Sequence, residues 1–326
     1  MAIAFTFPGQ GSQAVGMGKD LADTFVESRR IFEEVDDALG EKLSQLIWEG
    51  PEETLTLTAN AQPALMAVSL AAVRALEARG FSLNGKVTYV AGHSLGEYSA
   101  LAAAGFVSVA DAARLLRIRG NAMQAAVPAG EGAMAAIIGL EQADVEAACA
   151  EAAQGTARDP AQALVCQIAN DNGGGQLVIS GARPAVELAA KLCTEKGAKR
   201  ALMLQVSAPF HSALMKPAAE IMREALAAVT KSAPAVPLVS NVTVTPTSDP
   251  DEIARRLVEQ VVGRVRWRET VEWFGSNGVA TLYEVGAGKV LSGLARRINR
   301  DIATTAIGSA ADVEAALGRL HNQLAI

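Results

Sequence analysis

The chain has 326 residues, with 29 Lys and Arg against 35 Asp and Glu, so its formal net charge at pH 7 is -6. This acidic balance argues against non-specific binding of nucleic acid, which needs a basic face. Half of the residues are apolar but only 4% are aromatic, a composition that favours alanine-rich helices packed on a sheet over a β-sandwich. The length predicts one large domain, or one domain that carries a smaller insertion.

No apolar run reaches the roughly 18 residues that a membrane span needs, so we expect no membrane insertion. The N-terminal MAIAFTFPGQGS lacks the positive start and the cleavage site of a signal peptide, and it reads as a first buried strand. The three cysteines are widely and irregularly spaced, which fits neither a disulfide framework nor a CxxC metal site: Cys149, Cys166 and Cys193. We interpret them as core or helix cysteines in a reducing cytoplasm.

Short β-rich runs alternate with helical stretches along the whole chain. The predicted strands cover residues 3–7, 87–92, 164–170, 176–181, 201–206, 237–241 and 281–286. Several of them are continuously apolar, as strands covered by helices on both faces are. The pattern predicts an α/β fold with a mostly parallel sheet.

Residues 130–206 follow a different order, which is strand, helix, strand, GGG turn, strand, helix, strand. This βαββαβ order is the ferredoxin-like pattern. Gly130–Gly132 and Ser207–Pro209 would be the hinges to the rest of the chain. We therefore predict a small domain at 130–206 inserted into a larger one formed by 1–129 and 207–326, with a ligand-binding cleft between them.

A candidate nucleophile stands in Gly92-His93-Ser94-Leu95-Gly96, which matches the G-x-S-x-G nucleophile elbow. The elbow needs small flanking residues because its serine sits on a strained turn from a strand into a helix. A predicted strand precedes the motif and the helical EYSALAAAGF follows it. The alternative is a glycine-lined helix start with Ser94 as an N-cap.

A serine nucleophile needs a base, and the chain has only three histidines. His93 is a poor candidate because adjacent side chains diverge at an elbow. His321 lies in a predicted C-terminal helix, where it reads as a surface or helix-end residue. His211 remains as the candidate base, with no acidic residue near it in sequence to complete a triad.

Arg119 lies on the apolar side of a predicted helix, because its i±3 and i±4 neighbours are Leu115, Leu116, Ala122 and Met123. An unpaired guanidinium there would be costly. Either a structural carboxylate or a substrate carboxylate must pair with it, and periodicity alone favours the structural one. Arginine suits bidentate carboxylate binding.

Two glycine-rich stretches do not make nucleotide sites. Gly9-Gln10-Gly11 belongs to GQGSQAVG, which misses the G-x-G-x-x-G spacing. Gly286–Lys289 looks like the end of a P-loop, but Tyr283 replaces its first glycine and Val290 its Ser or Thr. No His, Cys and carboxylate cluster has metal-ligand spacing. We expect neither a metal nor a cofactor.

Five segments together resemble the malonyl-CoA:acyl carrier protein transacylase family: FPGQGSQ at 7–13, GHSLGEYSAL at 92–101, the Arg119 helix, FHSALMKPAA at 210–219 and YEVGAGKVL at 283–291. The resemblance implies an α/β-hydrolase-like core with a ferredoxin-like insertion. It implies ping-pong transfer of a malonyl group from malonyl-CoA to the phosphopantetheine thiol of an acyl carrier protein, for fatty-acid or polyketide synthesis. CoA and the carrier protein would be the partners of a monomeric enzyme.

The same resemblance assigns roles to individual residues. Ser94 would be acylated, His211 would be the base, and Gln260 would orient His211 through a main-chain carbonyl. Gln10 and Leu95 would supply the amides of the oxyanion hole, and Arg119 would bind the malonyl carboxylate. Further residues would line the substrate pocket: Gln62, Met123, Asn170, Asn172 and Phe210.

The chain departs from the family pattern at two loops. Gly263-Arg264 replaces the usual Asn-Pro before Val-x-Trp, and Gly173-Gly174 follows Asn172.

An acidic carrier protein would meet a basic patch, for which the candidates are Lys289, Arg264, Arg266, Arg296 and Arg297. The alternative functions are a serine thioesterase or esterase, and a non-catalytic module that binds a carrier protein.

Overall fold

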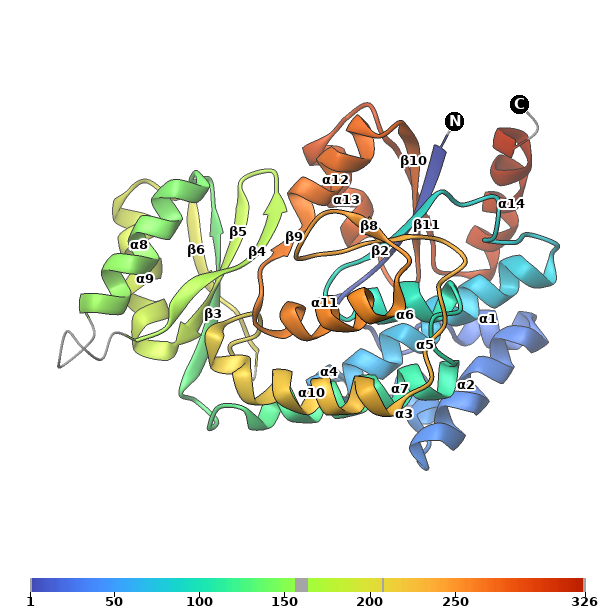
Figure 1. Ribbon diagram of the computed structural model, residues 1–326, viewed down its shortest axis with the longest axis horizontal. Helices are drawn as coiled ribbons and strands as arrows, with labels where there is room; N and C mark the ends of the chain where they lie inside the picture. Colours follow the sequence, from blue (N-terminus) through green and yellow to red (C-terminus); the bar gives the residue numbers. More distant parts are fainter. Residues whose placement is uncertain (1, 156–163, 207, 325–326) are drawn as a thin grey trace.

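A computed structural model describes residues 2–155, 164–206 and 208–324. The larger of its two sheets has the strand order β11-β10-β1-β2-β7-β8 (Figure 1). These strands are β1 (Ala2–Phe7), β2 (Tyr89–Gly92), β7 (Leu238–Val239), β8 (Pro246–Thr247), β10 (Val279–Val285) and β11 (Ala303–Ile307). The first five strands in that order pair in parallel, and β8 pairs antiparallel with β7. A mostly parallel sheet is thereby confirmed.

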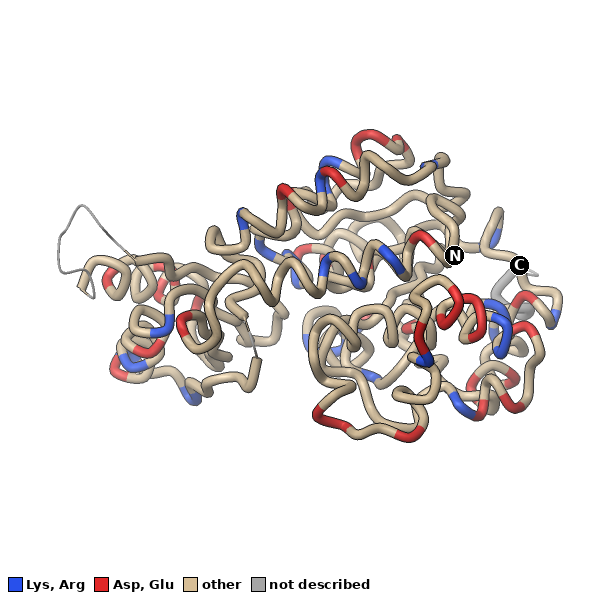
Figure 2. Tube along the Cα trace, turned by 90° about the horizontal axis from the view of Figure 1, so that it is seen from below, with Lys and Arg blue, Asp and Glu red and all other residues tan. Residues whose placement is uncertain are grey.

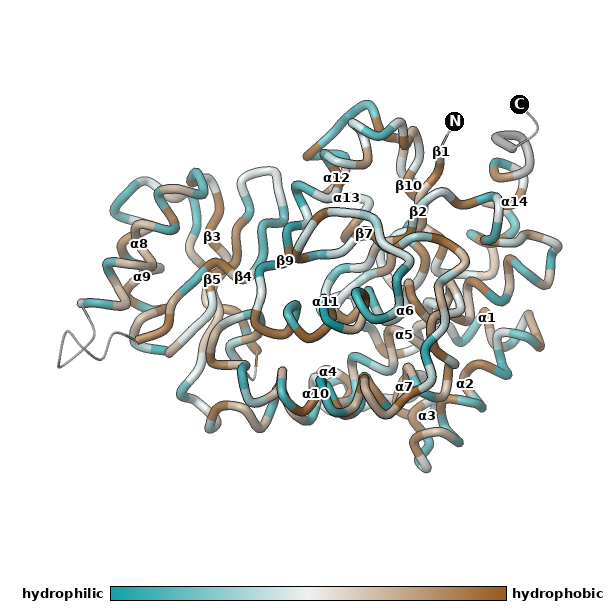
Figure 3. The backbone as a smooth tube through the Cα atoms, in the orientation of Figure 1, coloured by the Kyte–Doolittle hydropathy of each residue, from teal (hydrophilic) through white to brown (hydrophobic). Residues whose placement is uncertain are grey.

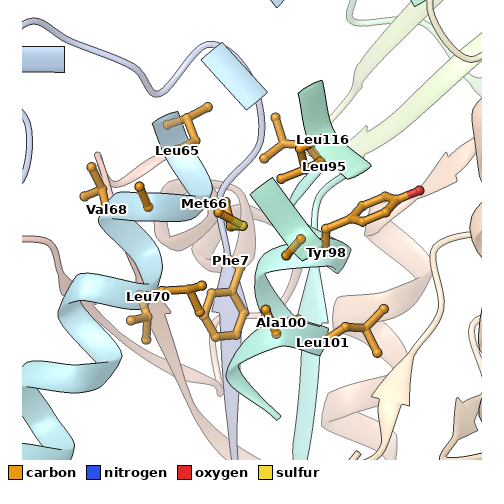
Figure 4. Packing of buried hydrophobic residues seen from close by; sticks show 14 of the residues in the cluster. Phe7, Leu65, Met66, Val68, Leu70, Leu95, Tyr98, Ala100, Leu101 and Leu116 are labelled. Atoms are coloured by element: carbon orange, nitrogen blue, oxygen red, sulfur yellow. The ribbon is translucent and has the colours of Figure 1, made fainter. Parts of the chain in front are cut away.

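Most helices surround this larger sheet. They are α1 (Lys19–Thr24), α2 (Val26–Leu39), α3 (Leu43–Glu49), α4 (Glu52–Thr56), α5 (Thr58–Ala78), α6 (Gly96–Ala103), α7 (Val109–Ala125), the 3-10 turn η2 (Ala213–Met215), α10 (Lys216–Ala228), α11 (Pro250–Val262), α12 (Trp267–Ser276), α13 (Val290–Ile298) and α14 (Ala310–Leu324). Helix α5 is rich in Ala and Leu and almost entirely buried, as expected of a helix that is apolar all round. Its side chains pack with those of β1, α6 and α7 in the main core (Figure 4).

The smaller sheet has the order β6-β3-β5-β4-β9. Its strands are β3 (Gly132–Ile138), β4 (Cys166–Gly173), β5 (Gln176–Ala182), β6 (Arg200–Met203) and β9 (Val265–Arg266), and its helices are α8 (Gln142–Gly155) and α9 (Arg183–Glu195). Alternate residues of β3 face opposite ways, because Ala135 and Ile137 pack with α8 and α9 whereas Met134 joins the main core. The smaller sheet therefore lies between its two helices and the larger part of the molecule (Figures 1 and 3).

The predicted strands all occur, with three differences from expectation. The strand predicted at 201–206 ends at Met203, although the Leu204 N–H still donates to the Met134 carbonyl of β3 (2.9 Å). Strands β8, β9 and β11 were not predicted. Strand β9 pairs in parallel with β4, so the smaller sheet includes residues from outside 130–206. Ser207, part of a predicted hinge, lies outside the described residues.

Within the described residues, no helix is long and apolar enough to cross a membrane, and no group of three or more His, Cys, Asp or Glu side chains is placed to hold a metal ion. All three cysteines are free thiols, with Cys149 and Cys193 buried in α8 and α9. Figure 2 shows Lys and Arg interspersed with Asp and Glu along several outer helices.

An ion pair with a buried carboxylate and a partly exposed arginine connects the smaller sheet to α12. Asp171 of β4 is buried, and its carboxylate accepts hydrogen bonds from Arg268 Nε (2.8 Å) and from the Gly173 N–H (3.2 Å). Arg268 also pairs with Glu272, which is half exposed. The same arginine thus has one buried and one exposed carboxylate partner.

We expect Asp171→Asn to lower the free energy of unfolding by about 1–3 kcal/mol, because a buried charge-assisted contact is weakened. Glu272→Gln, the matched control, should cost about 0–1 kcal/mol, because the exposed pair is screened by water. Urea unfolding of both variants gives the comparison. Equal losses would show that the buried pair does not tie the sheet to α12.

Candidate active site

Ser94 occupies the turn between β2 and α6 with a φ of 55°, in the left-handed region that side chains rarely adopt. The two flanking glycines make this turn sterically possible. A Cβ atom on Gly92 would lie 1.8 Å from the Gly96 carbonyl carbon, and a Cβ atom on Gly96 would lie 2.2 Å from the Phe7 carbonyl oxygen. The geometry is that of a nucleophile elbow.

The main-chain amides around Ser94 differ in their partners. The Ser94 N–H donates to Asn241 Oδ1 (2.9 Å), and the Gly96 N–H donates to the His93 carbonyl. Among the hydrogen bonds of the described residues, none starts from the N–H of Leu95 or of Gln10. Both of these residues line the cavity next to Ser94. Two amides are thus open to an oxygen atom placed there.

His211 lies against the serine hydroxyl, with Nε2 2.7 Å from Ser94 Oγ. Its Nδ1 lies 2.8 Å from the Gln260 carbonyl oxygen and 3.1 Å from the Gly263 carbonyl oxygen. Because a carbonyl can only accept, Nδ1 carries the proton and Nε2 is left free to accept the proton of Ser94. Two main-chain carbonyls thus hold the ring where a triad would use a carboxylate.

The environment keeps the His211 ring neutral. Burial, and secondly the positive charge of Arg119, lower the pKa of His211 to about 3, although the two carbonyl acceptors favour the protonated ring. The other histidine of the elbow points elsewhere. His93 Nε2 donates to Asn172 Oδ1 (2.9 Å), and its ring packs against Trp267. His321 lies in α14, but its side chain is outside the described part of the structure.

Arg119 of α7 is 1% exposed and reaches the same serine. Its Nη2 donates to Ser94 Oγ (3.1 Å) and to Gln260 Oε1 (2.7 Å), and its Nη1 donates to Gln62 Oε1 (2.7 Å). Among the described residues no carboxylate lies within ion-pair distance of it, and its Nε has no hydrogen-bond partner. The structural carboxylate favoured by periodicity is therefore not found there, and the guanidinium is held by neutral oxygens.

Helix packing explains why Arg119 reaches Gln62. The next residue, Gly120, lies directly against the first turn of α5, where a Cβ atom would be 2.6 Å from Ala59 Cα. This contact brings α7 close to α5. Gln62 in turn donates to Thr58 Oγ1 (2.8 Å), and its Nε2 is 3.8 Å from Met123 Sδ.

A cavity of about 290 Å³ opens at Ser94 between the two sheets. Predicted residues among its lining are Gln10, Gln62, Leu95, Arg119, Met123, Asn170 and Phe210, and the smaller sheet side adds Met134, Val178 and residues 204–206. Asn172 is not among the residues that line the cavity, but its side chain contacts His93, which is one of them. Gln260 also lies outside the lining and acts on residues that belong to it.

Known proteins are similar to this chain in both sequence and fold. The family model described as acyl transferase domain matches residues 4–320. The malonyl CoA-acyl carrier protein transacylase of Bacillus subtilis (strain 168) is 46% identical over 321 residues, which is 98% of each chain.

The chain belongs to the malonyl-CoA:acyl carrier protein transacylase family.

Solved structures of the family superpose closely. The acyl-carrier-protein-S-malonyltransferase of Bartonella henselae has a TM-score of 0.94 and 62% identity, and the match covers 98% of this chain and 100% of that one. A malonyl-transacylase solved in complex with its type II PKS acyl-carrier protein has a TM-score of 0.92 and 43% identity, again with 98% and 100% coverage. The transacylase family thus accounts for nearly the whole chain.

Two residues of the site were missed by sequence reasoning. Glu97, in the first turn of α6, is fully buried and accepts from the Asn241 N–H (2.6 Å) and from Gln260 Nε2 (2.5 Å). Burial raises the pKa of Glu97 to about 7, against the lowering effect of these donors and of Arg119. Asn241, after β7, also donates to the Gly92 carbonyl (2.7 Å). The only signal for Glu97 was its place three residues after the serine.

The structure also explains the P-loop-like stretch at Gly286–Lys289. Two N–H groups at the start of α13 already have an acceptor within the protein. The buried Glu284 carboxylate accepts hydrogen bonds from the Leu291 N–H (3.0 Å) and the Ser292 N–H (2.7 Å). A Cβ atom on Gly286 would lie 2.2 Å from Ser69 Oγ. These glycines serve close packing beside the site.

Of the five predicted basic-patch residues, two are paired with carboxylates. Arg264 pairs with Glu146 (2.7 Å), and Arg266 pairs with Glu269. Within the described ranges, Lys289, Arg296 and Arg297 have no carboxylate partner. These three keep their charge available to an acidic surface.

We expect Gly96→Ala to lower the free energy of unfolding by about 2–3 kcal/mol, because its methyl group would collide with the Phe7 carbonyl. The same change should abolish labelling of Ser94 by a sulfonyl fluoride, because the turn that exposes the hydroxyl is displaced. Gly293→Ala is the matched control, since Gly293 is also helical and has nothing within 4 Å of an added Cβ. Normal labelling of Gly96→Ala would contradict the elbow geometry.

The lowered pKa of His211 predicts a neutral ring throughout the range from pH 8 to pH 5. A histidine with its ordinary pKa of about 6.5 would be roughly 97% protonated at pH 5. NMR titration of the ring resonances tests this, and assignment needs only single substitutions because the chain has three histidines. A midpoint for His211 near 6.5 would show that burial and Arg119 do not depress its basicity.

Proposed function

We propose that this chain transfers a malonyl group from malonyl-CoA to the phosphopantetheine thiol of an acyl carrier protein, through an ester on Ser94. The observation that carries the proposal is the convergence of Ser94, His211 and an Arg119 without a carboxylate partner at one cavity. The names of the relatives support the same reaction. The carrier protein held by the related malonyl-transacylase supports the acceptor.

In the first half-reaction, the Ser94 hydroxyl gives its proton to His211 Nε2 while Oγ attacks the thioester carbonyl. The Gln10 and Leu95 amides stabilise the resulting oxyanion, each contributing about 2.7–4 kcal/mol to the lowering of the barrier. The carbon–sulfur bond then breaks, and His211 returns the proton to the departing thiolate. Free CoA leaves, and the malonyl ester remains on Ser94.

In the second half-reaction, the carrier's phosphopantetheine thiol gives its proton to His211 and attacks the ester carbonyl. The bond between Ser94 Oγ and the acyl carbon breaks, and His211 reprotonates the serine. The products are malonyl carrier protein and the starting enzyme. Because His211 ends each half-reaction neutral, the same residue acts as base and then as acid.

Arg119 gives the site its preference for a carboxylate-bearing acyl group. Its guanidinium is buried, is held by neutral oxygens and lies over the Tyr98 ring, so a malonyl carboxylate would supply a paired negative charge. That charge would also offset the effect of Arg119 on His211, whose pKa Arg119 now lowers. Malonyl binding would thus make the base stronger, and an acetyl group would not.

The acidic carrier protein would approach the mouth of the cavity along Lys289, Arg296 and Arg297. Gly288, next to Lys289, lies against Ser12, where an added Cβ would be 3.4 Å from Ser12 Cβ. The neighbouring Gly11 and Gln13 line the cavity. Lys289 is thus placed beside the entrance.

The finer description of the fold belongs to the same proposal. We infer that residues 130–206 form a ferredoxin-like insertion in an α/β-hydrolase-like core. The order β6-β3-β5-β4 of the smaller sheet, with α8 and α9 on one face, supports the insertion. The parallel larger sheet with an elbow after β2 supports the core.

Intact mass after mixing with malonyl-CoA alone tests the proposal. We expect a malonyl adduct on the wild type that is absent from Ser94→Ala and is discharged by a pantetheine thiol. Arg119→Ala should lower the ratio of malonyl to acetyl transfer about ten- to a hundredfold, since a buried charge-assisted contact is lost. Arg117→Ala is the control, because Arg117 on the same helix pairs with Glu41 instead.

The alternatives give different results. Discharge of the adduct by water as fast as by thiol would indicate a thioesterase or esterase. Binding of carrier protein without any Ser94 ester would indicate a non-catalytic module. An acetyl adduct that forms as readily as the malonyl adduct would contradict the role of Arg119.

A further inference from the structure

The Glu97 carboxylate connects three parts of the site from a fully buried position in the first turn of α6. Its Oε1 accepts from the Asn241 N–H (2.6 Å), and its Oε2 accepts from Gln260 Nε2 (2.5 Å). Neither oxygen touches Ser94, His211 or the cavity, whose lining does not include Glu97. Apart from the Coulombic attraction between Glu97 and Arg119, any effect of Glu97 on the reaction must therefore pass through its two hydrogen-bond partners.

The donors and acceptors around Gln260 allow only one orientation of its side-chain amide. Nε2 donates both to Glu97 Oε2 and to the Ser94 carbonyl oxygen (2.9 Å), and Oε1 accepts from Arg119 Nη2 (2.7 Å). If the amide were reversed, its oxygen would face two other acceptors and its nitrogen would face the guanidinium donor. Such contacts are repulsive and leave buried groups unpaired.

Arg119 depends on that orientation. Its Nη2 is held by Gln260 Oε1 within reach of Ser94 Oγ, and its Nη1 is held by Gln62 Oε1. With Gln260 reversed, Nη2 would face an NH₂ group and would lose the acceptor that keeps it beside the serine.

From this network we propose that Glu97 is a positioning residue that sets acyl-group selectivity, because its carboxylate keeps the Gln260 amide oxygen turned toward Arg119. The inference rests on the proposed malonyl transfer and adds a residue whose hydrogen bond to Gln260 keeps Arg119 in place. The Gln260 main-chain carbonyl, which holds His211, is separate from this side-chain contact.

The isosteric change Glu97→Gln tests the effect, because the loss of the negative charge near Arg119 would by itself strengthen malonyl binding and so change the ratio in the opposite direction. Glu97 offers two acceptors to two donors, whereas a glutamine amide offers one acceptor and one donor. The Asn241 N–H belongs to the main chain and cannot turn, so the glutamine oxygen would remain with it and the NH₂ would face Gln260. The two NH₂ groups would then face each other and repel, so the Gln260 side chain would shift and its Oε1 contact with Arg119 Nη2 would weaken.

The test compares kcat/KM for Ser94 acylation by malonyl-CoA and by acetyl-CoA in the full-length protein. For Glu97→Gln we expect kcat/KM with malonyl-CoA to fall about tenfold or more, as for loss of a buried contact to a charged group. With acetyl-CoA, which does not use Arg119, it should change by less than about threefold. The malonyl-to-acetyl ratio therefore falls, and a merely structural role would lower both values together.

Glu284→Gln is the matched control, because Glu284 is another buried carboxylate that accepts from two N–H groups and is not part of the cavity lining. Its ratio should equal that of the wild type, with any loss confined to Tm. An unchanged ratio in Glu97→Gln, an equal fall with both substrates, or the same shift in Glu284→Gln would overturn the proposal.

Gln260→Leu provides a second route, and it carries the test if Glu97→Gln does not fold. It removes the side-chain amide but keeps the main-chain carbonyl on His211, so it should lower the same ratio. In the double variant the two effects should not add, because Glu97 acts through Gln260. An unchanged ratio in Gln260→Leu, or additive effects, would overturn the proposal. Absence of malonyl discrimination in the wild type would instead overturn the proposed function, and this inference with it.

Discussion

The close approach of α6 to the ends of β1 and β2 is the constraint on which the site depends. Gly96 lies so near the Phe7 carbonyl that no side chain fits, and this contact forces Ser94 into its left-handed turn. The hydroxyl then stands clear of the sheet. Arg119 from α7, His211 before α10 and Gln260 of α11 all reach that single position. Displacing α6 would move the one residue that all three contact, His211 and Arg119 at its hydroxyl and Gln260 at its main-chain carbonyl.

The strands that could be predicted are those whose own residues show an apolar pattern. Strands β1, β2 and β10 are mostly apolar because helices cover both faces, and their sequences show it. Strands β8 and β9 have only two residues each, too few for any period, and they exist through their partners. Strand β11 (ATTAI) has a single large apolar residue, Ile307, at its end, too few to indicate a buried strand.

The residues of the site also fall into those that the sequence predicts and those that it does not. Ser94 could be predicted from its motif, His211 by elimination and the buried face of Arg119 from helical spacing. Glu97 could not, because an acidic residue in the first turn of a helix has an ordinary role beside the helix dipole. Asn172 was expected to line the cavity like Asn170, two residues before it on β4. The pairing of β4 with β5 shifts register at Ile168/Asn170 and at Asp171/Gly173, which breaks the alternation of side chains.

The pairing of β4 with β9 has a consequence for attempts to widen the acyl pocket. Asn170 of β4 forms part of the cavity wall and pairs with Val265, two residues after the Gly263 carbonyl that holds His211. Moving this wall to enlarge the pocket would also displace the segment whose carbonyl orients His211. The range of accepted acyl groups and the turnover rate would therefore change together. Residues 204–206 line the same cavity after leaving β6 at the free edge of the sheet. Engineering for bulkier acyl groups is therefore better aimed at that edge.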